Sequence, residues 1–473
     1  MRSERVKLGG MWSRALFAAS CLAVATASSC GSDSAATRPN VVLVLIDTLR
    51  PDHLPFYGYE RDTAPFLTEI AAQSAVFERA FSSSTWTAPA TASLFTALYP
   101  PQHGVTRGFF VHRAKLVEQG KIDPARLSLT RLPESLPTLP ELFQRAGYDT
   151  LGISTNVNIG NEIGFDSGFD EFARMYGDDH PKGASATDVA AQLRTWTATL
   201  DDDKPNFVYL HLNDVHEPYE PEQGHFGEHG EPALENIEEA RARYDSEIRE
   251  LDATLAAMYR EFAMDRNTLF VLVSDHGEEF MEHGDTGHKF SVYRELCQIA
   301  LTIRAPELGV APRRIANNVS IIDVAPTLAE LCDLPWPGDL EGRSLAPLLG
   351  VGVASASRRD DTTRPLFVHR SNRDLKKPGA ARERESAVEL WAVIEGDWKL
   401  IQRGEEFELY DFATDPLEAH NRFTERPEIA ARLQHTLATF QRNARNRGAT
   451  DVELPLDAAR EDALNKLGYT DEK

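Results

Sequence analysis

The sequence predicts an α/β fold in which a central sheet carries helices on both faces. Short apolar, β-rich runs alternate with helical patterns up to about residue 365, several of these runs end in a polar or acidic residue, and closely spaced short strands follow. Strands that alternate with helices are typical of a layered α/β sheet. Such sheets bind ligands beyond the carboxyl ends of their strands.

The elements of this first part follow from local patterns. A proline in the first turn marks a helix start, as at Pro65 and Pro89. Helices are predicted at 65–73, 89–98 and 139–145. Strands are predicted at 40–46, 148–154, 207–212, 269–274 and 299–303. The polar segments 114–134, 221–236 and 351–364 are predicted as solvated loops, of which the first two could rim an active site.

The pattern after residue 365 predicts a small antiparallel sheet with a covering helix. Its short strands are predicted at 366–369, 390–394, 398–402 and 408–410, and its helix at 427–442. With 473 residues the chain is long enough for one large core and a smaller domain. The predicted organisation is a signal peptide at 1–30, a linker at 31–38, a catalytic domain at 39–364 and a C-terminal subdomain with its tail at 365–473.

The N-terminal residues predict export. Basic residues precede an apolar run at 15–27, which is typical of a signal peptide and too short to span a bilayer comfortably. Cys30 follows small residues and predicts a lipoprotein attachment site, with an ordinary signal peptide as the alternative because Ala27 replaces the usual leucine. The expected location is the periplasm or the outer membrane, with a lipid anchor as the only membrane contact.

The charge balance excludes one class of partner. The formal net charge of -23 makes nucleic acid a poor ligand. An anionic substrate would need a local cationic site, for which a bound metal ion is the natural source.

A metal site is predicted from two acidic strand ends. Asp47 ends the run at 41–46, and Asp275 with His276 ends the run at 269–274. Either carboxylate alone would usually cap the following helix. Together, oxygen ligands and one imidazole suit Ca²⁺, Mg²⁺, Mn²⁺ or Zn²⁺.

Thr87 is the candidate nucleophile. It stands just ahead of Pro89, at a helix start whose free N–H groups favour negative charge. A threonine at that place is most often only an N-cap. Coordination to a metal would lower the cost of its alkoxide and allow it to attack.

Two histidines and a lysine are candidates for the remaining chemistry. His216 follows the strand at 207–212, and His288 and Lys289 follow the strand at 269–274. Either histidine could protonate a leaving oxygen and Lys289 could bind an anion, although each alone would more often be a surface residue. The sequence leaves open whether His283 is a metal ligand or a loop residue.

These residues resemble the sulfatase family within the alkaline phosphatase superfamily. The resemblance is carried by 39–47, 87–91, 216–219, 274–277 and 287–289, and by the C-terminal pattern from 393 onward. It implies an alkaline-phosphatase-like mixed sheet and a hydrolase of sulfuric or phosphoric esters. The metal ligands that it implies are Asp47, Thr87, Asp275 and His276, with His216, His288 and Lys289 around the anionic group.

The sequence departs from the family pattern at the nucleophile and around it. Thr87 replaces the cysteine or serine that is oxidised to formylglycine, so no formylglycine is expected. Thr91 stands in place of the motif arginine and Thr48 in place of a second aspartate. A typical Gly-Lys-Trp-His stretch is replaced by residues that include Asn156. Asn156 and Thr91 are predicted to contact the substrate.

Three hypotheses follow. The first is a metal-dependent hydrolase of a sulfate or phosphate ester, whose anionic substrate could belong to an envelope or extracellular glycan. Phosphate is chemically preferred, because a sulfated threonine cannot expel sulfate by collapsing to an aldehyde as a formylglycine hydrate does. The second is a transferase that moves a phosphoalcohol onto a cell-envelope glycan. The third is a binding protein that has kept the fold and lost turnover.

Overall fold

The computed structural model describes residues 38–106, 126–176, 183–200, 203–227, 236–288, 291–351, 364–371 and 388–455. The predicted signal peptide, its Cys30 and the candidate Lys289 lie outside these residues. Among the described residues, no helix combines the length and apolar character that crossing a bilayer requires.

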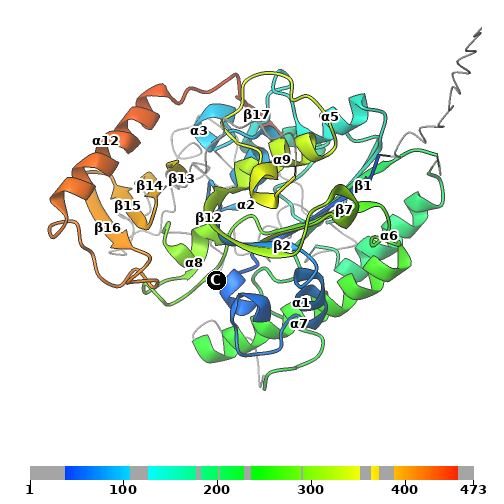
Figure 1. The fold of residues 1–473 in the computed structure, drawn as a ribbon, viewed down its shortest axis with the longest axis horizontal. Helices are drawn as coiled ribbons and strands as arrows, with labels where there is room; N and C mark the ends of the chain where they lie inside the picture. Colours follow the sequence, from blue (N-terminus) through cyan, green and yellow to red (C-terminus); the bar gives the residue numbers. More distant parts are fainter. Residues whose placement is uncertain are drawn as a thin grey trace, which may run out of the picture. The chain divides into compact units, whose positions relative to one another are not determined.

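A mixed sheet forms the centre of the described chain (Figure 1). Its strands are β1 (Asn40–Ile46), β2 (Ala75–Phe81), β4 (Asp149–Ser154), β5 (Glu171–Arg174), β6 (Asn206–Leu212), β7 (Thr268–Val273), β10 (Gln298–Ile299), β11 (Leu301–Arg304) and β12 (Arg313–Ser320). Their order is β10-β2-β11-β7-β1-β6-β4-β5, and β12 pairs with β2. The strands from β7 to β5 are parallel, whereas β11 is antiparallel to both of its neighbours. The parallel part therefore collects several strand ends at one edge.

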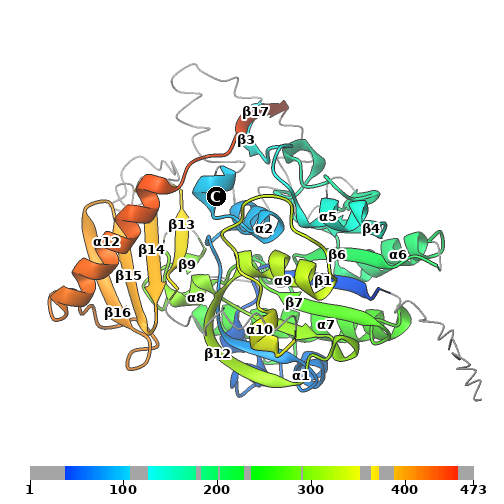
Figure 2. The ribbon, with the colours of Figure 1, turned by 45° about the horizontal axis from the view of Figure 1, so that its top comes forward.

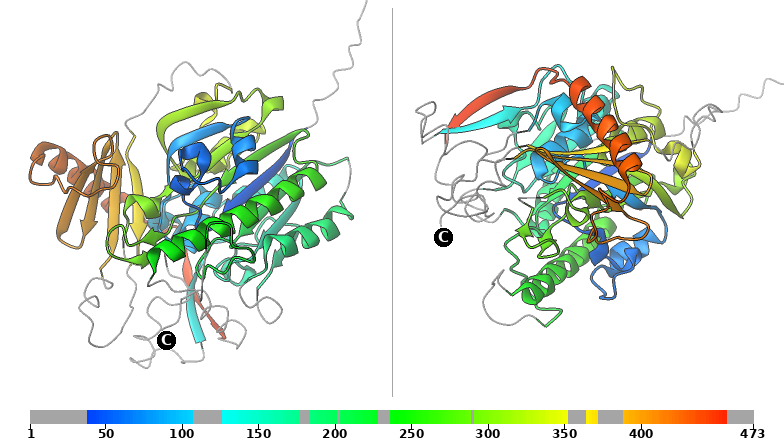
Figure 3. Two further views of the ribbon diagram at one scale, coloured as in Figure 1. Left: turned by 90° about the horizontal axis from the view of Figure 1, so that it is seen from below. Right: turned by 90° about the vertical axis from the view of Figure 1, so that its left-hand side faces the viewer.

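Helices cover both faces of this sheet. They are α1 (Pro65–Ala71), α2 (Thr87–Thr96), α3 (Pro100–His103), α5 (Leu139–Arg145), α6 (Ala186–Thr197), α7 (Ile237–Glu261), α8 (Arg294–Cys297), α9 (Val324–Leu331) and α10 (Ala346–Leu349). Alternate residues of β1 point to opposite faces. Leu43 joins the core shared with α2, α5 and α9, and Val44 joins the core shared with α1, α6 and α7. Figure 3 shows the long α7 beside α6.

A second, antiparallel sheet follows near the C-terminus. It runs β13 (Leu366–Arg370), β14 (Leu390–Glu395), β15 (Trp398–Arg403) and β16 (Glu406–Asp411), and α12 (Pro427–Asn443) packs against β14 and β15 (Figure 2). Leu433 and Leu437 of α12 are buried there. The predicted sheet and covering helix are confirmed. The boundary at residue 365 stays a prediction, because the described residues from Arg38 onward belong to one unit.

The structure also corrects parts of the sequence prediction. The strand predicted at 299–303 is two strands, β10 and β11, separated at Ala300. The predicted loop at 114–134 contains the strand β3 (Arg126–Arg131), which pairs with β17 (Thr450–Pro455). The elements that the prediction missed include β2, β5, β12, β17, α6, α7 and α9. The apolar stripe of α7 is interrupted by many charged residues, which hid its periodicity.

Candidate active site

Four neighbouring parallel strands bring polar side chains to one edge of the sheet. Asp47 follows β1, Asn156 follows β4, Asn213 follows β6 and Asp275 follows β7. In the order β7-β1-β6-β4 these strands are adjacent. Because the carboxyl ends of parallel strands meet at the same edge, residues more than 200 positions apart in sequence lie together there.

Asp47, Asp275 and His276 converge on one point. Each offers a ligand atom, and these atoms lie within 4.8 Å of one another. His276 Nε2 is 3.7 Å from Asp47 Oδ1 and 3.4 Å from Asp275 Oδ2. All three side chains are fully buried, and these three atoms have no hydrogen-bond partner among the described residues. Buried polar atoms without partners are costly, so this arrangement fits a bound cation.

The protonation of His276 and Asp275 also fits a metal ion. His276 Nδ1 lies 2.9 Å from the Gly277 carbonyl oxygen, so Nδ1 carries the proton and the lone pair of Nε2 faces the cluster. Burial, followed by the charge of His288, lowers the pKa of His276 to about 3, which keeps the ring neutral. Burial and the charge of Asp47 raise the pKa of Asp275 well above its usual value. A cation would offset this repulsion.

Thr87 is held at this cluster by Asp47. Its Oγ1 donates a 3.1 Å hydrogen bond to Asp47 Oδ2. Thr87 is the first residue of α2, whose N-cap is Trp86 without a side-chain capping bond. The N-cap interpretation of Thr87 is therefore wrong, and α2 begins two residues earlier than predicted. The hydroxyl lies at a helix start, where the free N–H groups favour a developing negative charge.

Further polar residues orient Asp47. Asn156 Nδ2 donates to Asp47 Oδ2 at 2.7 Å and to Asn213 Oδ1 at 2.9 Å. His211 Nε2 lies 3.7 Å from Asp47 Oδ2, and the Tyr209 hydroxyl lies 2.9 Å from His211 Nδ1. The amide nitrogen of Asn156 already donates both of its hydrogen bonds to protein oxygens. Its predicted contact with the substrate would require one of these two bonds to be replaced by a bond to the substrate.

Both candidate proton donors lie near the cluster. The ring centroids of His216 and His288 are 5.0 Å apart, and those of His276 and His288 are 4.7 Å apart. His288 Nδ1 lies 3.0 Å from Glu278 Oε1, and Thr48 Oγ1 donates to Glu278 Oε2 at 3.2 Å. Glu278 therefore brings a carboxylate to the position at which Thr48 departs from the family pattern.

Two residues of this site, His211 and Glu278, were not predicted from the sequence. His211 lies inside an apolar strand, where a single histidine resembles a core residue. Glu278 directly follows Gly277, and its place next to the acidic strand end was the available signal. Thr91 is fully buried one turn after Thr87, and its substrate contact stays a prediction.

Glycine is required at position 277 because the backbone of Glu295 lies too close for a side chain. A Cβ placed there would lie 1.9 Å from the Glu295 carbonyl oxygen and 3.2 Å from Arg50 Cγ, and the Gly277 N–H donates to Leu296 O. We expect Gly277→Ala to destabilise the protein by about 1–3 kcal/mol, because backbone must move next to His276. Urea unfolding would measure this loss. An unchanged midpoint would show that the loop adapts freely.

His283 pairs with a carboxylate. Its Nδ1 lies 2.7 Å from Glu295 Oε1, and its Nε2 lies 3.3 Å from Glu418 O. Burial alone would lower the pKa of His283, but the hydrogen bond and charge of Glu295 outweigh it and raise this pKa to about 9. These contacts form an ion pair that fixes the loop. His283 also belongs to a group with Glu279 and Glu295 whose ligand atoms lie within 4.8 Å of one another, so its role as a metal ligand stays a prediction.

This pair makes the stability depend on pH. Because the folded pKa of His283 exceeds its ordinary value of 6.5, the stabilisation is complete below about pH 6.5 and is lost as the pH rises through about 9. We expect the difference in Tm between wild type and Glu295→Gln to shrink over that range in thermal unfolding scans. The exposed Glu307→Gln is the control, and a constant difference for Glu295→Gln would contradict the pairing.

Comparisons with known proteins agree with this geometry. Residues 39–334 match the family model described as Sulfatase, and residues 282–443 match one described as N-sulphoglucosamine sulphohydrolase, C-terminal. The chain is 22% identical over 448 residues to a Delta 4,5-hexuronate-2-O-sulfatase of Bacteroides thetaiotaomicron. This match covers 83% of this chain and 86% of that protein. It is 27% identical over 214 residues to arylsulfatase K of Canis lupus familiaris, but this match spans 45% of the chain and only 38% of that protein.

Solved structures share the fold. The phosphonate monoester hydrolase of Agrobacterium radiobacter superposes with a TM-score of 0.65 at 21% identity, covering 86% of this chain and 96% of that one. The first family model spans more than half of the chain. The chain therefore belongs to the sulfatase family and is an ester hydrolase of that family. The predicted fold is confirmed.

Proposed function

We propose that this chain is a metal-dependent hydrolase of phosphate esters with Thr87 as its nucleophile. One observation carries the proposal, namely the hydrogen bond from Thr87 Oγ1 to Asp47 Oδ2 beside the unpartnered atoms of Asp275 and His276. The convergence of these groups counts against a binding protein that has lost turnover.

The nucleophile decides between phosphate and sulfate. A formylglycine hydrate expels sulfate by returning to the aldehyde, whereas threonine cannot form that aldehyde. A threonine ester must instead be opened by water, which is the route of phosphoryl transfer through a phosphothreonine. The fold neighbour described as a phosphonate monoester hydrolase is consistent with phosphorus chemistry in this architecture.

A divalent cation held by Asp47, Asp275 and His276 would neutralise the anionic group and lower the pKa of the Thr87 hydroxyl. The Thr87 hydroxyl gives its proton to Asp47 Oδ2, which accepts its hydrogen bond, as Oγ1 bonds to phosphorus and the bond from phosphorus to the ester oxygen breaks. His288 or His216 protonates the departing alcohol, and Glu278 holds the His288 ring through Nδ1. Water then attacks the phosphothreonine, releases phosphate and restores the hydroxyl.

The remaining assignments extend this proposal. Lys289 and Thr91 would contact the anionic group, and the ester would come from an envelope or extracellular glycan that the protein meets after export. Export and the lipid anchor depend on the N-terminal sequence alone.

The test is a panel of aryl esters that share one leaving group. Purified protein loaded with Mn²⁺, Mg²⁺, Ca²⁺ or Zn²⁺ is assayed with an aryl phosphate, an aryl phosphodiester, an aryl phosphonate and an aryl sulfate. We expect turnover of a phosphorus ester to exceed that of the sulfate. Turnover of the sulfate alone would overturn the argument from Thr87. Products formed with an added alcohol acceptor would reveal a transferase instead.

A further inference from the structure

Two asparagines form a hydrogen-bonded amide pair beside Asp47. Asn156 follows β4 and Asn213 follows β6, and these two strands are adjacent and parallel. Asn156 Nδ2 donates to Asn213 Oδ1 at 2.9 Å and to Asp47 Oδ2 at 2.7 Å. Asn156 is fully buried, and Asn213 is buried except for 7% of its surface. The pair therefore connects the ends of two strands to the carboxylate at the end of a third.

The backbone determines which way the Asn156 amide faces. Its Oδ1 accepts a 2.7 Å hydrogen bond from the backbone N–H of Asn158, so its nitrogen faces Asp47. The backbone N–H of Asn213 donates to Thr155 Oγ1 at 3.0 Å, which ties the end of β6 to the end of β4. Because these bonds hold both asparagines at the strand ends, the pair can fix the position of a side chain that it contacts.

The Asn156 amide has no hydrogen left for a substrate. A side-chain amide offers two N–H donors, and those of Asn156 are used by Asp47 and Asn213. The amide oxygen is an acceptor, as an anionic ester oxygen is, so these two oxygens would repel each other. A substrate contact at Asn156 would have to break its bond to Asp47 or its bond to Asn213.

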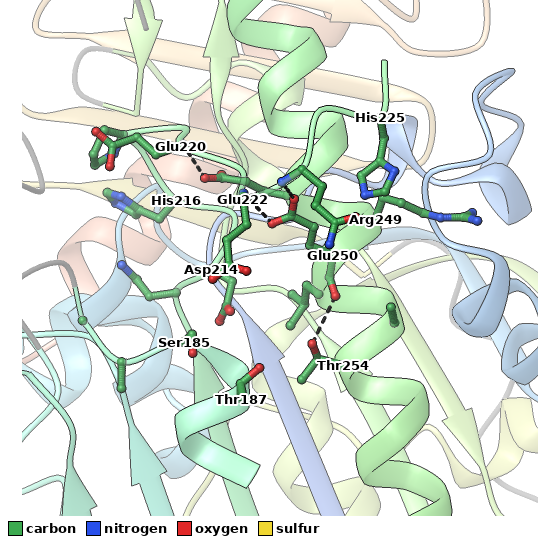
Figure 4. Close-up of a pocket in the computed structure, with 18 of the residues that line it drawn as sticks. Ser185, Thr187, Asp214, His216, Glu220, Glu222, His225, Arg249, Glu250 and Thr254 are labelled. Atoms are coloured by element: carbon green, nitrogen blue, oxygen red, sulfur yellow. Dashed lines mark hydrogen bonds between the residues drawn. The ribbon is translucent and has the colours of Figure 1, made fainter. Parts of the chain in front are cut away.

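A neighbouring cavity reaches the outer member of the pair. The cavity has a volume of about 490 Å³, and its lining includes Asp214 and His216 (Figure 4). Asn213 also lines this cavity, whereas Asn156 does not. Asn156 thus lies between Asn213 and Asp47 and away from the cavity.

The bond from Asn156 distinguishes the two oxygens of Asp47. Oδ2 accepts from Thr87 Oγ1 at 3.1 Å, and Oδ1 lies 3.7 Å from His276 Nε2. A carboxylate can exchange its oxygens by turning about its last side-chain bond. The bond from Asn156 ends on Oδ2 and opposes this rotation. It therefore keeps Oδ2 at Thr87 and Oδ1 beside His276.

We infer that Asn156 is a positioning residue that acts on Thr87 through Asp47, and that Asn213 supports it. This inference rests on the proposed function, because it takes Thr87 as the nucleophile. In this role Asn156 contributes to the formation of phosphothreonine without touching the substrate, in contrast to the substrate contact predicted from the sequence. Without the amide, Asp47 can turn, so Thr87 is held less often in the attacking position while the substrate keeps its contacts.

The test is Asn156→Ala, studied in single turnovers with the aryl ester that the panel selects. We expect the rate constant for phosphorylation of Thr87 to fall at least about ten-fold, because a misplacement of about 1 Å can cost about 10²-fold in rate. This rate constant does not depend on the fraction of folded protein. A purely structural defect would lower the yield of phosphothreonine and leave the rate constant unchanged.

Two further readouts separate positioning from substrate contact. The ester concentration that gives half of the maximal single-turnover rate and the Ki of inorganic phosphate are each expected to change less than about two-fold, because the groups that bind the anion are retained. Added Mn²⁺ should raise the Tm of Asn156→Ala as it raises that of wild type, because the three proposed metal ligands remain. The exposed Asn161→Ala, a few residues further along the chain, should match wild type in every readout.

The second asparagine allows a double-mutant cycle. Asn213→Ala removes the acceptor of one Asn156 N–H and is expected to lower the same rate constant about three-fold. In the Asn156→Ala protein it should have little further effect, because it acts through Asn156. An unchanged rate constant in Asn156→Ala, additive effects of the two substitutions or a raised Ki with an unchanged rate constant would overturn this inference alone. A wild-type protein that turns over esters without forming phosphothreonine would overturn the proposed function instead.

Discussion

Replacing Thr87 by alanine is expected to lower kcat/KM for the ester substrate at least about 10³-fold. The variant lacks the oxygen that forms the covalent intermediate. Thr87→Ser retains the hydroxyl and is expected to keep measurable turnover. Steady-state kinetics of the three proteins on the preferred aryl ester would measure both effects.

The serine variant is the matched control for this prediction, because it changes the side chain without removing the attacking atom. Thr87→Ala loses a single hydrogen bond to Asp47. Its Tm is therefore expected to fall by only a few degrees. Acid quenching during turnover, followed by mass spectrometry, should find a phosphoryl group on the peptide that contains Thr87. Full activity in Thr87→Ala would show that another group attacks the ester.

The sequence predicted the site residues that directly follow an apolar strand. Asp47 and Asp275 each end an apolar run, and parallel strands bring such ends together whatever their distance in sequence. Thr87 was recognised at a helix start, although its partner was not, because the hydrogen bond to Asp47 depends on how α2 packs against β1. Local pattern thus located the residues but left their contacts open.

The missed parts depend on packing rather than on local pattern. His211 alternates with apolar residues in β6, and only the sheet order places it beside Asp47. The helix α7 was missed because its many charged residues interrupt the apolar stripe and make its periodicity difficult to recognise. The fold class and the C-terminal sheet needed only strand spacing, so both could be predicted.

Asp47 connects the separate groups of the site. Oδ2 accepts hydrogen bonds from Thr87 and Asn156, whereas Oδ1 has no hydrogen-bond partner in the described part of the chain and lies 3.7 Å from His276 Nε2. One carboxylate can therefore orient the nucleophile with one oxygen and offer the other to a cation. Asp275 Oδ1 accepts a 2.9 Å hydrogen bond from the backbone N–H of His276, whereas Oδ2 has no hydrogen-bond partner among the described residues, so Oδ2 is the atom that would face a cation.

Asp275→Asn is expected to abolish metal-dependent stabilisation and to lower kcat/KM at least about 10²-fold. The amide keeps the size of the side chain and removes the charge that a divalent cation needs. A ligand at one hundred times its Kd stabilises the folded protein by about 2.7 kcal/mol. Added Mn²⁺ should therefore raise the Tm of wild type and leave that of Asp275→Asn almost unchanged. The exposed Asp265→Asn, at the other end of β7, should respond as wild type does.

Without a metal ion, Asp275→Asn should no longer be the less stable of the two proteins. Burial and Asp47 raise the pKa of Asp275, so ionised Asp275 destabilises the metal-free fold at neutral pH, and its replacement by an amide removes that cost. After chelation, Asp275→Asn is expected to be at least as stable as wild type in urea. A large loss of stability in metal-free Asp275→Asn would mean that Asp275 supports the fold through protein contacts. In that case the converging atoms of Asp47, Asp275 and His276 would require an explanation other than a cation.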